Sequence, residues 1–230
     1  MNFITPLTAA TALDDLVRAN VKYGLAAYVD LHGRIKGKCV PVEHFDRMIA
    51  GSELYTGAAL DGVPQDISDD EVAAMPDVAR ALRMPWKPEI AWFPSDLYLR
   101  GEPFEADSRG ILKRQLAAAA DLGYDFMTGI EPEFYIFKGD AEGRPVPTSE
   151  RDTLAKPCYE VSTLLDSFPY VGEIVDAMNQ LGWDVYSFDH EDGNGQFEID
   201  FHHADALTTS DRITFLKLMV GEIARKHGYF

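Results

Sequence analysis

The residues best suited to chemistry lie in two short acidic stretches. In the first, Glu131 and Glu133 lie within the segment Gly129–Phe137, where the second half alternates between polar and apolar residues. This alternation predicts a strand that is buried on at least one face. Because side chains two positions apart point to the same face of a strand, both carboxylates would lie on one side, about 7 Å apart.

The second stretch, residues 189–201, repeats this pattern. Glu191 comes before a Gly-Asn-Gly sequence that favours a turn, and Glu198 comes after it. Beyond the turn, polar and apolar side chains would occupy opposite faces of one strand: Gln196, Glu198 and Asp200 against Phe197, Ile199 and Phe201. Carboxylates gathered in this way need a counter-charge, and oxygen ligands favour Mg²⁺ or Mn²⁺ over zinc.

A solvated acidic face is the alternative interpretation of the same residues, since the chain carries 38 Asp and Glu against 21 Lys and Arg. Composition and spacing alone leave both interpretations open. A calcium-binding EF-hand loop is excluded, because aligning Gly195 with the required glycine would put His190 and Phe201 in ligand positions. The sequence also lacks the P-loop pattern G-x-x-x-x-G-K-[ST].

Longer strings around these residues carry a resemblance to a known family. Gly-Ile-Glu-Pro-Glu-Phe at 129–134 resembles the G-x-E-P-E-F strand of glutamine synthetases, and residues 190–198 resemble their H-E-x-x-x-G-Q-x-E segment. The fuller strings at 186–199 and 152–159 are similar to the type III glutamate–ammonia ligases, a branch that includes the γ-glutamylmethylamide synthetases. The resemblance covers nearly the whole chain.

The resemblance implies an ATP-dependent ligase that forms the γ-amide of L-glutamate from ammonia or methylamine. In this family ATP phosphorylates the side-chain carboxylate, and the amine then displaces phosphate from the γ-glutamyl phosphate. The resemblance places Glu131 at the metal ion shared with the nucleotide. It places three further glutamates at the ion nearer the substrate carboxylate: Glu133, Glu191 and Glu198. Such ions, Mg²⁺ or Mn²⁺, neutralise charge on the transferred phosphoryl group.

Other positions near these motifs have less certain roles. Tyr186 stands where many family members have a nucleotide-contacting glutamate, which places Tyr186 near ATP. His190 could orient Glu191 through a hydrogen bond or simply cap the turn. His202 and His203 would face opposite sides of their strand, which argues against a metal site that uses both. No catalytic acid or base is assigned.

The segment 54–59 departs from the family pattern. Most members have F-D-G-S-S here, and an aspartate and a serine of this loop reach the active site of a neighbouring subunit. Thr56 and Ala59 occupy those two places in this chain, whereas Asp70 matches a later aspartate of the family. The departure leaves the amine open, because a reshaped site could suit methylamine as well as ammonia.

The net charge and composition of the chain limit the kinds of partner it can bind. Its 230 residues carry a net charge of −17, which argues against nucleic-acid and anionic-membrane surfaces. Two cysteines without metal-type spacing, and no basic leader or transmembrane-length run, favour a cytoplasmic protein. The family resemblance implies a large homo-oligomer of stacked rings with active sites between subunits.

The predicted fold class is α+β, in two domains. Residues 1–103 are expected to form a β-grasp domain, with a helix at 11–23 capped by Thr11, a hairpin over 25–41, and a loop at 52–70. Prolines within 78–99 favour edge strands and turns over a central strand.

Residues 104–230 are expected to form a glutamine synthetase catalytic domain, a mostly antiparallel sheet with helices on one face. Three helices are predicted there, at 107–122, 170–181 and 210–226. Tyr229-Phe230 resembles the start of another strand, so we expect the domain to be incomplete here. The alternative function is therefore a non-catalytic fragment, or an assembly or regulatory module of glutamine synthetase type.

Overall fold

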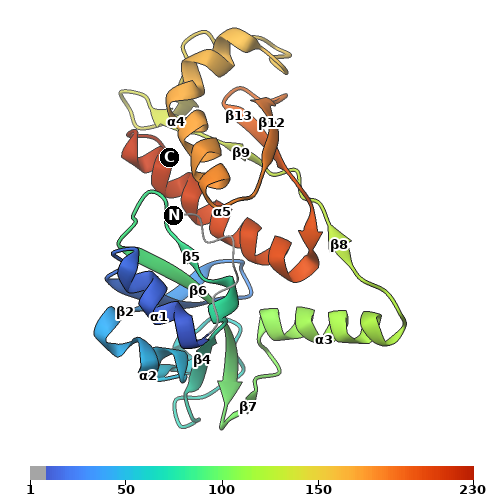
Figure 1. Cartoon of the computed structure of the whole chain (residues 1–230). Helices are drawn as coiled ribbons and strands as arrows, with labels where there is room; N and C mark the ends of the chain where they lie inside the picture. Colours follow the sequence, from blue (N-terminus) through green and yellow to red (C-terminus); the bar gives the residue numbers. More distant parts are fainter. Residues whose placement is uncertain (1–8) are drawn as a thin grey trace. The chain divides into compact units, whose positions relative to one another are not determined.

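A computed structural model describes the backbone of residues 9–230, with side chains from residue 14 onward (Figure 1). The chain divides into two compact units. The first comprises the chain up to Phe126 together with Asp205–Thr214, and the second comprises Met127–Ala204 together with Phe215–Phe230. Helix α5 (Ala206–Lys226), which follows the short strand β14 (Ala204–Asp205), contributes residues to both units.

The first unit is built around one sheet. Its strands are β1 (Tyr23–Val29), β2 (Ile35–Pro41), β3 (Glu53–Tyr55), β4 (Val72–Pro76), β5 (Leu82–Arg83), β6 (Ile90–Leu99) and β7 (Glu102–Pro103). Its helices are α1 (Ala9–Arg18), α2 (Phe45–Ile49) and α3 (Ser108–Asp121), with 3₁₀ turns at Val42–His44, Gly57–Ala59 and Val78–Arg80.

The strand order of this sheet is β2-β1-β6-β4-β3, and β5 and β7 also pair with β6. Strands β1 and β6 are parallel, whereas the other pairs are antiparallel. A central parallel pair flanked by antiparallel strands is the β-grasp arrangement. The predicted hairpin is present as β1 and β2, which pair from Tyr23 with Pro41 to Val29 with Ile35.

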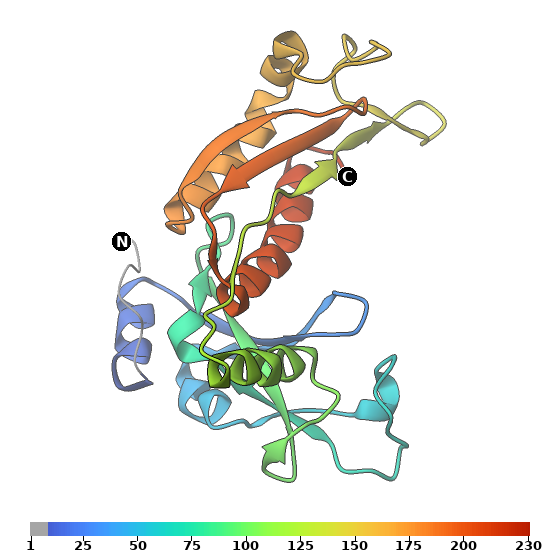
Figure 2. The same cartoon turned by 90° about the vertical axis from the view of Figure 1, so that its right-hand side faces the viewer.

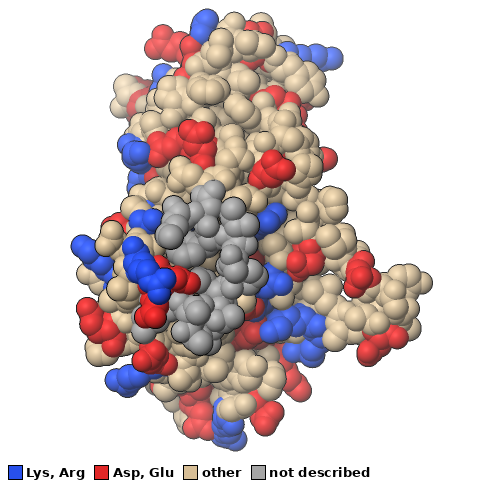
Figure 3. Space-filling model, viewed as in Figure 1, with Lys and Arg blue, Asp and Glu red and all other residues tan. Residues whose placement is uncertain are grey.

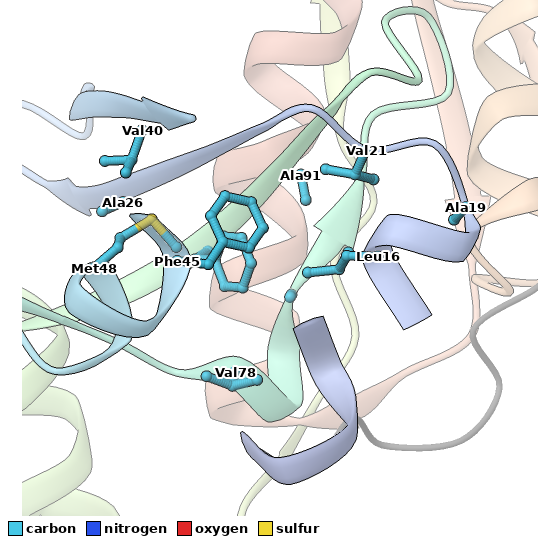
Figure 4. Packing of buried hydrophobic residues seen from close by; sticks show 11 residues of the cluster. Leu16, Ala19, Val21, Ala26, Val40, Phe45, Met48, Val78 and Ala91 are labelled. Carbon is cyan, nitrogen blue, oxygen red and sulfur yellow. The ribbon is translucent and has the colours of Figure 1, made fainter. Parts of the chain in front are cut away.

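A hydrophobic core joins the sheet to α1 and α2 (Figure 4). Its largest members, Phe45 and Phe93, pack edge to face with ring centroids 5.8 Å apart. Figure 4 shows Leu16 of α1 and Met48 of α2 directed toward this cluster. A second group of buried side chains gathers around Tyr28, Tyr55 and Leu97. These cores account for the stability of the sheet, because burial of apolar surface is the main favourable term in folding.

The second unit contains three-stranded and two-stranded sheets with helices. Its elements are β8 (Met127–Thr128), β9 (Glu133–Tyr135), β10 (Phe137–Gly139), β11 (Pro145–Pro147), α4 (Val161–Gln180), β12 (Val185–His190), β13 (Gln196–Phe201) and the C-terminal part of α5. The order β12-β13-β9 is antiparallel throughout, and β10 pairs with β11. Phe137 and Phe230 exchange two backbone hydrogen bonds of 2.8 and 2.9 Å.

The two faces of the sheet β12-β13-β9 differ in character. Phe197, Ile199 and Phe201 of β13 are at most 3% exposed. Tyr170 of α4 packs edge to face on Phe197, and Phe215 of α5 packs on Trp183, which lies against Phe201. Figure 2 shows α4 along this side of the β12–β13 hairpin. The predicted sheet with helices on one face is confirmed, and the opposite face carries the carboxylates.

Several predicted elements differ from the observed ones. The helix expected at 11–23 is α1, Ala9–Arg18, because Tyr23 and Gly24 belong to β1. The predicted Thr11 cap concerns a side chain outside the described residues. The loop expected at 52–70 begins with β3, whose short ladder to β4 covers only Glu53–Tyr55.

Two prolines lie inside regular elements, and for one of them, Pro94, the sequence favours an edge strand or turn. Pro94 lies in β6, a central strand, at the point where pairing with β1 ends at Ala27 and pairing with β4 begins at Ser95. Helix α4 begins at Val161, nine residues before the predicted start at Tyr170, and Pro169 lies inside it. Proline removes one hydrogen bond from a ladder or helix, and each surrounding element is long enough to form without it.

Acidic side chains are distributed over the elements of both units on the face that Figure 3 presents, with basic side chains among them. On this face, the excess negative charge of the chain is therefore spread out. The carboxylates of β12, β13 and β9 differ from these exposed charges, since they are gathered on one sheet.

Candidate metal centre

Carboxylates from three adjacent strands form a row on the polar face of the second unit's sheet. Glu198 of β13 lies opposite Asp189 of β12 on one side and opposite Glu133 of β9 on the other. Directly opposed residues in antiparallel strands point to the same face. Like charges in such positions are destabilising, so this row requires a compensating positive charge.

Glu191, in the turn between β12 and β13, joins this row. Ligand atoms of Asp189, Glu191 and Glu198 all lie within 4.8 Å of one another. Burial raises the pKa of the Glu198 carboxyl to about 7, and the neighbouring charges of Asp200, Glu191 and Asp189 add to the rise. Burial and the Glu191 charge likewise raise the pKa of Asp189. The cluster is thus strained by its own negative charge.

A divalent cation fits this cluster. Asp189 and Asp200 each have one buried carboxylate oxygen, Oδ1, without a hydrogen-bond partner. Among the described residues, no lysine or arginine forms an ion pair with Asp189, Glu191, Glu198 or Asp200. Unpaired carboxylate oxygens without a neighbouring cationic side chain are the donor set that Mg²⁺ or Mn²⁺ takes.

The two predicted glutamates of the first stretch lie at the start of β9. Glu133 is the first residue of β9 and Glu131 comes two positions before it; both are exposed, while Pro132 and Phe134 between and beyond them are less so. Burial raises the pKa of Asp200, and the nearby charge of Glu131 raises it further. The structure therefore brings Glu133 to the row and Glu131 to its Asp200 end.

Gln196 fixes the carboxylate of Glu133. Its side-chain amide donates to Glu133 Oε2, while its Oε1 accepts from the Gly193 backbone N–H at 2.8 Å and from the Tyr135 hydroxyl at 3.0 Å. Gln196 is 9% exposed. A buried amide with both ends bonded holds Glu133 in one orientation.

His190 caps the turn rather than orienting a side-chain ligand. Its Nδ1 lies 2.8 Å from the backbone carbonyl oxygen of Glu191, and its Nε2 lies 2.8 Å from Asp152 Oδ2. Neither nitrogen contacts the carboxylate of Glu191. Of the two interpretations of His190, the structure supports the capping role.

Tyr186 lies at an irregularity of β12. The pairing with β13 shifts between Val185 and Ser187, which leaves Tyr186 as the extra residue. Its side chain is exposed, and its ring centroid lies 5.2 Å from the ring centroid of His202. Such bulges redirect a side chain and are frequent near active sites. His202 Nε2 lies 3.2 Å from Asp184 Oδ2, and His202 is not a member of the carboxylate cluster.

The residues aligned with the family's ammonium loop belong to the first unit. Thr56 donates to Glu71 at 2.8 Å, and Asp70 pairs with Arg100 at 2.5 Å. Both interactions are exposed. These are the partners that the structure gives Thr56 and Asp70, and their place in the amine site stays a prediction.

Asp189 is a cluster member that the sequence argument missed. A turn centred between Gly193 and Asn194 pairs residues whose numbers are symmetric about it, as His190 with Phe197 and Asp189 with Glu198. The Gly-Asn-Gly sequence marked this turn, so the register could have been read from the sequence. Asp152 was also missed, and only tertiary structure places it at the turn.

The comparison with protein families decides the identity of this chain. Residues 105–230 match the family model described as glutamine synthetase, catalytic domain. The chain belongs to the glutamine synthetase family. The family model begins close to the predicted boundary between residues 103 and 104, which remains a prediction.

Curated relatives support this assignment. The chain is 37% identical over 223 residues to the glutamate–methylamine ligase of Methyloversatilis universalis, covering 96% of this chain and 50% of that protein. It is 37% identical over 211 residues to the glutamine synthetase of Rhizobium leguminosarum bv. phaseoli, covering 91% of this chain and 47% of that protein. The chain thus spans about half the length of the curated relatives it matches.

Solved structures show the same fold. A GmaS–ADP complex superposes with a TM-score of 0.90 at 34% identity, covering 95% of this chain and 50% of that one. A Plasmodium falciparum glutamine synthetase gives a TM-score of 0.83 at 15% identity over 100% of this chain and 50% of that one, which supports the fold alone. Within residues 9–230, no helix has the length and apolarity needed to cross a membrane.

Proposed function

We propose that the intact protein is an ATP-dependent ligase that forms the γ-amide of L-glutamate from methylamine or ammonia. The observation that carries the proposal is the row Asp189–Glu198–Glu133, with Glu191 beside it, on a chain of the glutamine synthetase family. Relatives of similar identity are named for glutamate–methylamine and for glutamine synthesis, which supports both amines.

The carboxylates are assigned to two cation positions. Glu133, Glu191 and Glu198 would hold the ion nearer the glutamate substrate, with Asp189 beside them, and Glu131 would hold the ion shared with the nucleotide. When bound, Mg²⁺ or Mn²⁺ neutralises the charge that develops on a transferred phosphoryl group.

The protein's own contribution is to hold these carboxylates together despite their repulsion. The apolar face of β13 is anchored under α4 and α5, so the opposite face cannot turn away from the site. Gln196 holds Glu133, and the β12–β13 turn holds Glu191. A site prepared in this way loses little free energy to reorganisation when it binds its ions and substrates.

The chemistry explains why such a site is needed. A carboxylate is a poor acyl donor, because its oxygen is a poor leaving group. Transfer of the γ-phosphoryl group of ATP to the glutamate side chain converts that oxygen into phosphate, which the amine displaces. Ammonia and methylamine differ by one methyl group, a difference of about 1–3 kcal/mol in a pocket, so few residues decide between them.

Three further features belong to the proposal. Tyr186, exposed at the β12 bulge, is proposed to contact the nucleotide, so Tyr186→Ala should raise the KM for ATP more than Tyr186→Phe does. We propose a large homo-oligomer with active sites between subunits, as the family resemblance implies. A reducing, cytoplasmic location suits the two cysteines, which are both free.

Phosphate release from ATP tests the proposed function. The intact protein would be assayed with Mg²⁺ and L-glutamate, in the presence of methylamine, ammonia or no amine. Release that depends on glutamate and is fastest with methylamine indicates a γ-glutamylmethylamide synthetase, and fastest release with ammonia indicates a glutamine synthetase. Absence of amine-dependent release would overturn the proposal in favour of a non-catalytic module.

A pair of variants ties the activity to the cluster. Glu198→Gln removes one charge from the row, and we expect at least about a 100-fold loss, since even outer-shell partners of a metal site cost 10- to 100-fold. Glu150→Gln changes an exposed glutamate of the same unit and should leave the rate unchanged. Equal rates in the two variants would contradict the site assignment.

A further inference from the structure

Asp152 is a buried carboxylate whose hydrogen bonds all converge on one distant turn. It lies between β11 and α4, and its side chain is 1% exposed. Its Oδ2 accepts from the backbone N–H of Gly195 at 2.6 Å and lies 2.8 Å from His190 Nε2. Its Oδ1 accepts from the side-chain amide of Asn194 at 2.7 Å. An anion this deeply buried is costly unless it is fully bonded, and here the bonds come from residues 190–195.

The segment that follows Asp152 contacts the same turn. The backbone carbonyl of Leu154 accepts from the Asn194 amide at 3.2 Å, and the N–H of Tyr159 donates to the His190 carbonyl at 2.8 Å. Cys158 Sγ lies 3.9 Å from Glu191 Oε2. The turn is therefore held from outside at several points along residues 152–159.

Within the turn, Glu191 is held by hydrogen bonds to its near neighbours. Its N–H donates to the Gln196 carbonyl at 3.0 Å and its Oε2 accepts from the Asp192 N–H at 2.9 Å, while the Gln196 N–H donates to the Gly193 carbonyl at 2.9 Å. Gly195 has φ of +80°, a backbone conformation that glycine adopts readily and residues with a Cβ rarely adopt. Repulsion among Asp189, Glu191 and Glu198 acts to push Glu191 away from the strands.

We infer that Asp152 is a positioning residue, which holds the 190–195 turn so that Glu191 stays with Asp189 and Glu198 as one cation-binding cluster. The inference rests on the proposed function, since it assigns a partner to the same site. Asp152 acts through His190, Asn194 and Gly195 and touches none of the cluster carboxylates.

Asp140 provides a matched control within the same unit. It also accepts hydrogen bonds from a turn, at 2.8 Å from the Arg144 N–H and 3.0 Å from the Glu142 N–H. That turn joins β10 to β11 and contains none of the proposed site residues. Asp140→Asn therefore removes a turn-capping carboxylate without affecting the position of Glu191.

The test measures Mn²⁺ binding to the intact protein by electron paramagnetic resonance, which reports free Mn²⁺ without requiring activity. Asp152→Asn should weaken Mn²⁺ binding about 10- to 100-fold, as expected for loss of an outer-shell partner. Asp140→Asn should leave Mn²⁺ binding as in the wild type. Wild-type affinity in Asp152→Asn would overturn the inference.

A double variant separates positioning from folding. In Asp152→Asn/Asn194→Asp the amide and carboxylate exchange places, so the bond between positions 152 and 194 is restored. The inference is supported if the double variant binds Mn²⁺ more tightly than Asp152→Asn does. It is also supported if Asp152→Asn alone does not fold, whereas the double variant folds and binds Mn²⁺. A folded double variant with no recovery overturns it.

The same measurement distinguishes the metal centre from the role of Asp152. A wild-type protein that does not bind Mn²⁺ would overturn the proposed metal centre itself. If the wild-type protein binds Mn²⁺ and Asp152→Asn binds it equally tightly, only the role of Asp152 is overturned.

Discussion

Both units gather carboxylates in partly buried positions, but only one supplies its own positive charge. In the first unit, Arg109 forms ion pairs with Asp77 at 2.8 Å, Asp96 at 2.6 Å and Asp211 at 3.0 Å. In the second unit, the described residues include no lysine or arginine paired with Asp189, Glu191 or Glu198. The first cluster is complete as folded, whereas the second is complete only when a cation binds.

The pKa shifts of the two clusters express this difference. Burial acts to lower the pKa of Arg109, but its bonds to Asp211 and Asp77 and the Asp96 charge reverse this, so the pKa is raised. In the second unit, burial and neighbouring carboxylates both raise the pKa of Glu198, to about 7. Burial also raises the pKa of Asp211, but the bond to Arg109 and its charge act against that rise, whereas the neighbouring carboxylates at Glu198 add to the rise.

The largest expected effect comes from removing the cation of the first cluster. Arg109→Ala removes the buried guanidinium that pairs with all three carboxylates, although Asp96 keeps Lys113 and Asp77 keeps Arg80. Breaking a buried pair in this way costs about 3–5 kcal/mol. The free energy of unfolding, measured by urea denaturation, should fall by that amount.

Arg100 provides the control for this prediction. It pairs with Asp70 at the surface, where its side chain is 74% exposed, so Arg100→Ala should cost at most about 1 kcal/mol. Equal losses in the two arginine variants would show that the Arg109 cluster is not the structural element described here.

The second cluster should respond to added cation instead. Mn²⁺ at 100 times its dissociation constant should raise the free energy of unfolding by about 2.7 kcal/mol, because it binds the folded state. Glu198→Gln should show a much smaller increase at the same concentration. An increase of the same size in both proteins would place the binding of Mn²⁺ elsewhere.

A smaller effect is expected from pH in the absence of divalent cation. The pKa of Glu198 is raised from 4.5 to about 7 in the folded protein, so the neutral carboxyl is favoured there. The stability that this group contributes is present below pH 4.5 and is lost as the pH rises through about 7.

Glu198→Gln cannot titrate, so its free energy of unfolding should increase relative to that of the wild type between pH 4.5 and 7. Paired denaturation curves at several pH values measure this difference. A difference that stays constant over that range would contradict the proposed repulsion at Glu198.

The sequence predicts the parts of the site that local pattern determines. Alternation in residues 196–201 gave the two faces of β13, and the glycines marked the turn that presents Glu191. The helix predicted to begin at 107 is α3, and Asp107 caps it by accepting from the Gly110 N–H at 2.9 Å. Each of these features depends on residues a few positions apart.

Features that depend on distant residues were not predictable in this way. Asp152 reaches Asn194 and Gly195 from more than forty positions away, and nothing in the local sequence of Asp152 indicates these partners. Pro94 and Pro169 mislead for a related reason, since neighbouring strands and helices decide whether a missing N–H matters. Tertiary packing therefore overrides the local signal at these positions.

The most direct test of the central claim is to locate a bound cation. Crystals of the intact protein soaked in Mn²⁺ would be measured at the manganese absorption edge, where anomalous scattering identifies the ion. We expect an anomalous peak among the carboxylates of Asp189, Glu191 and Glu198. Ordered Mn²⁺ elsewhere in the molecule, with no peak at this cluster, would contradict that claim.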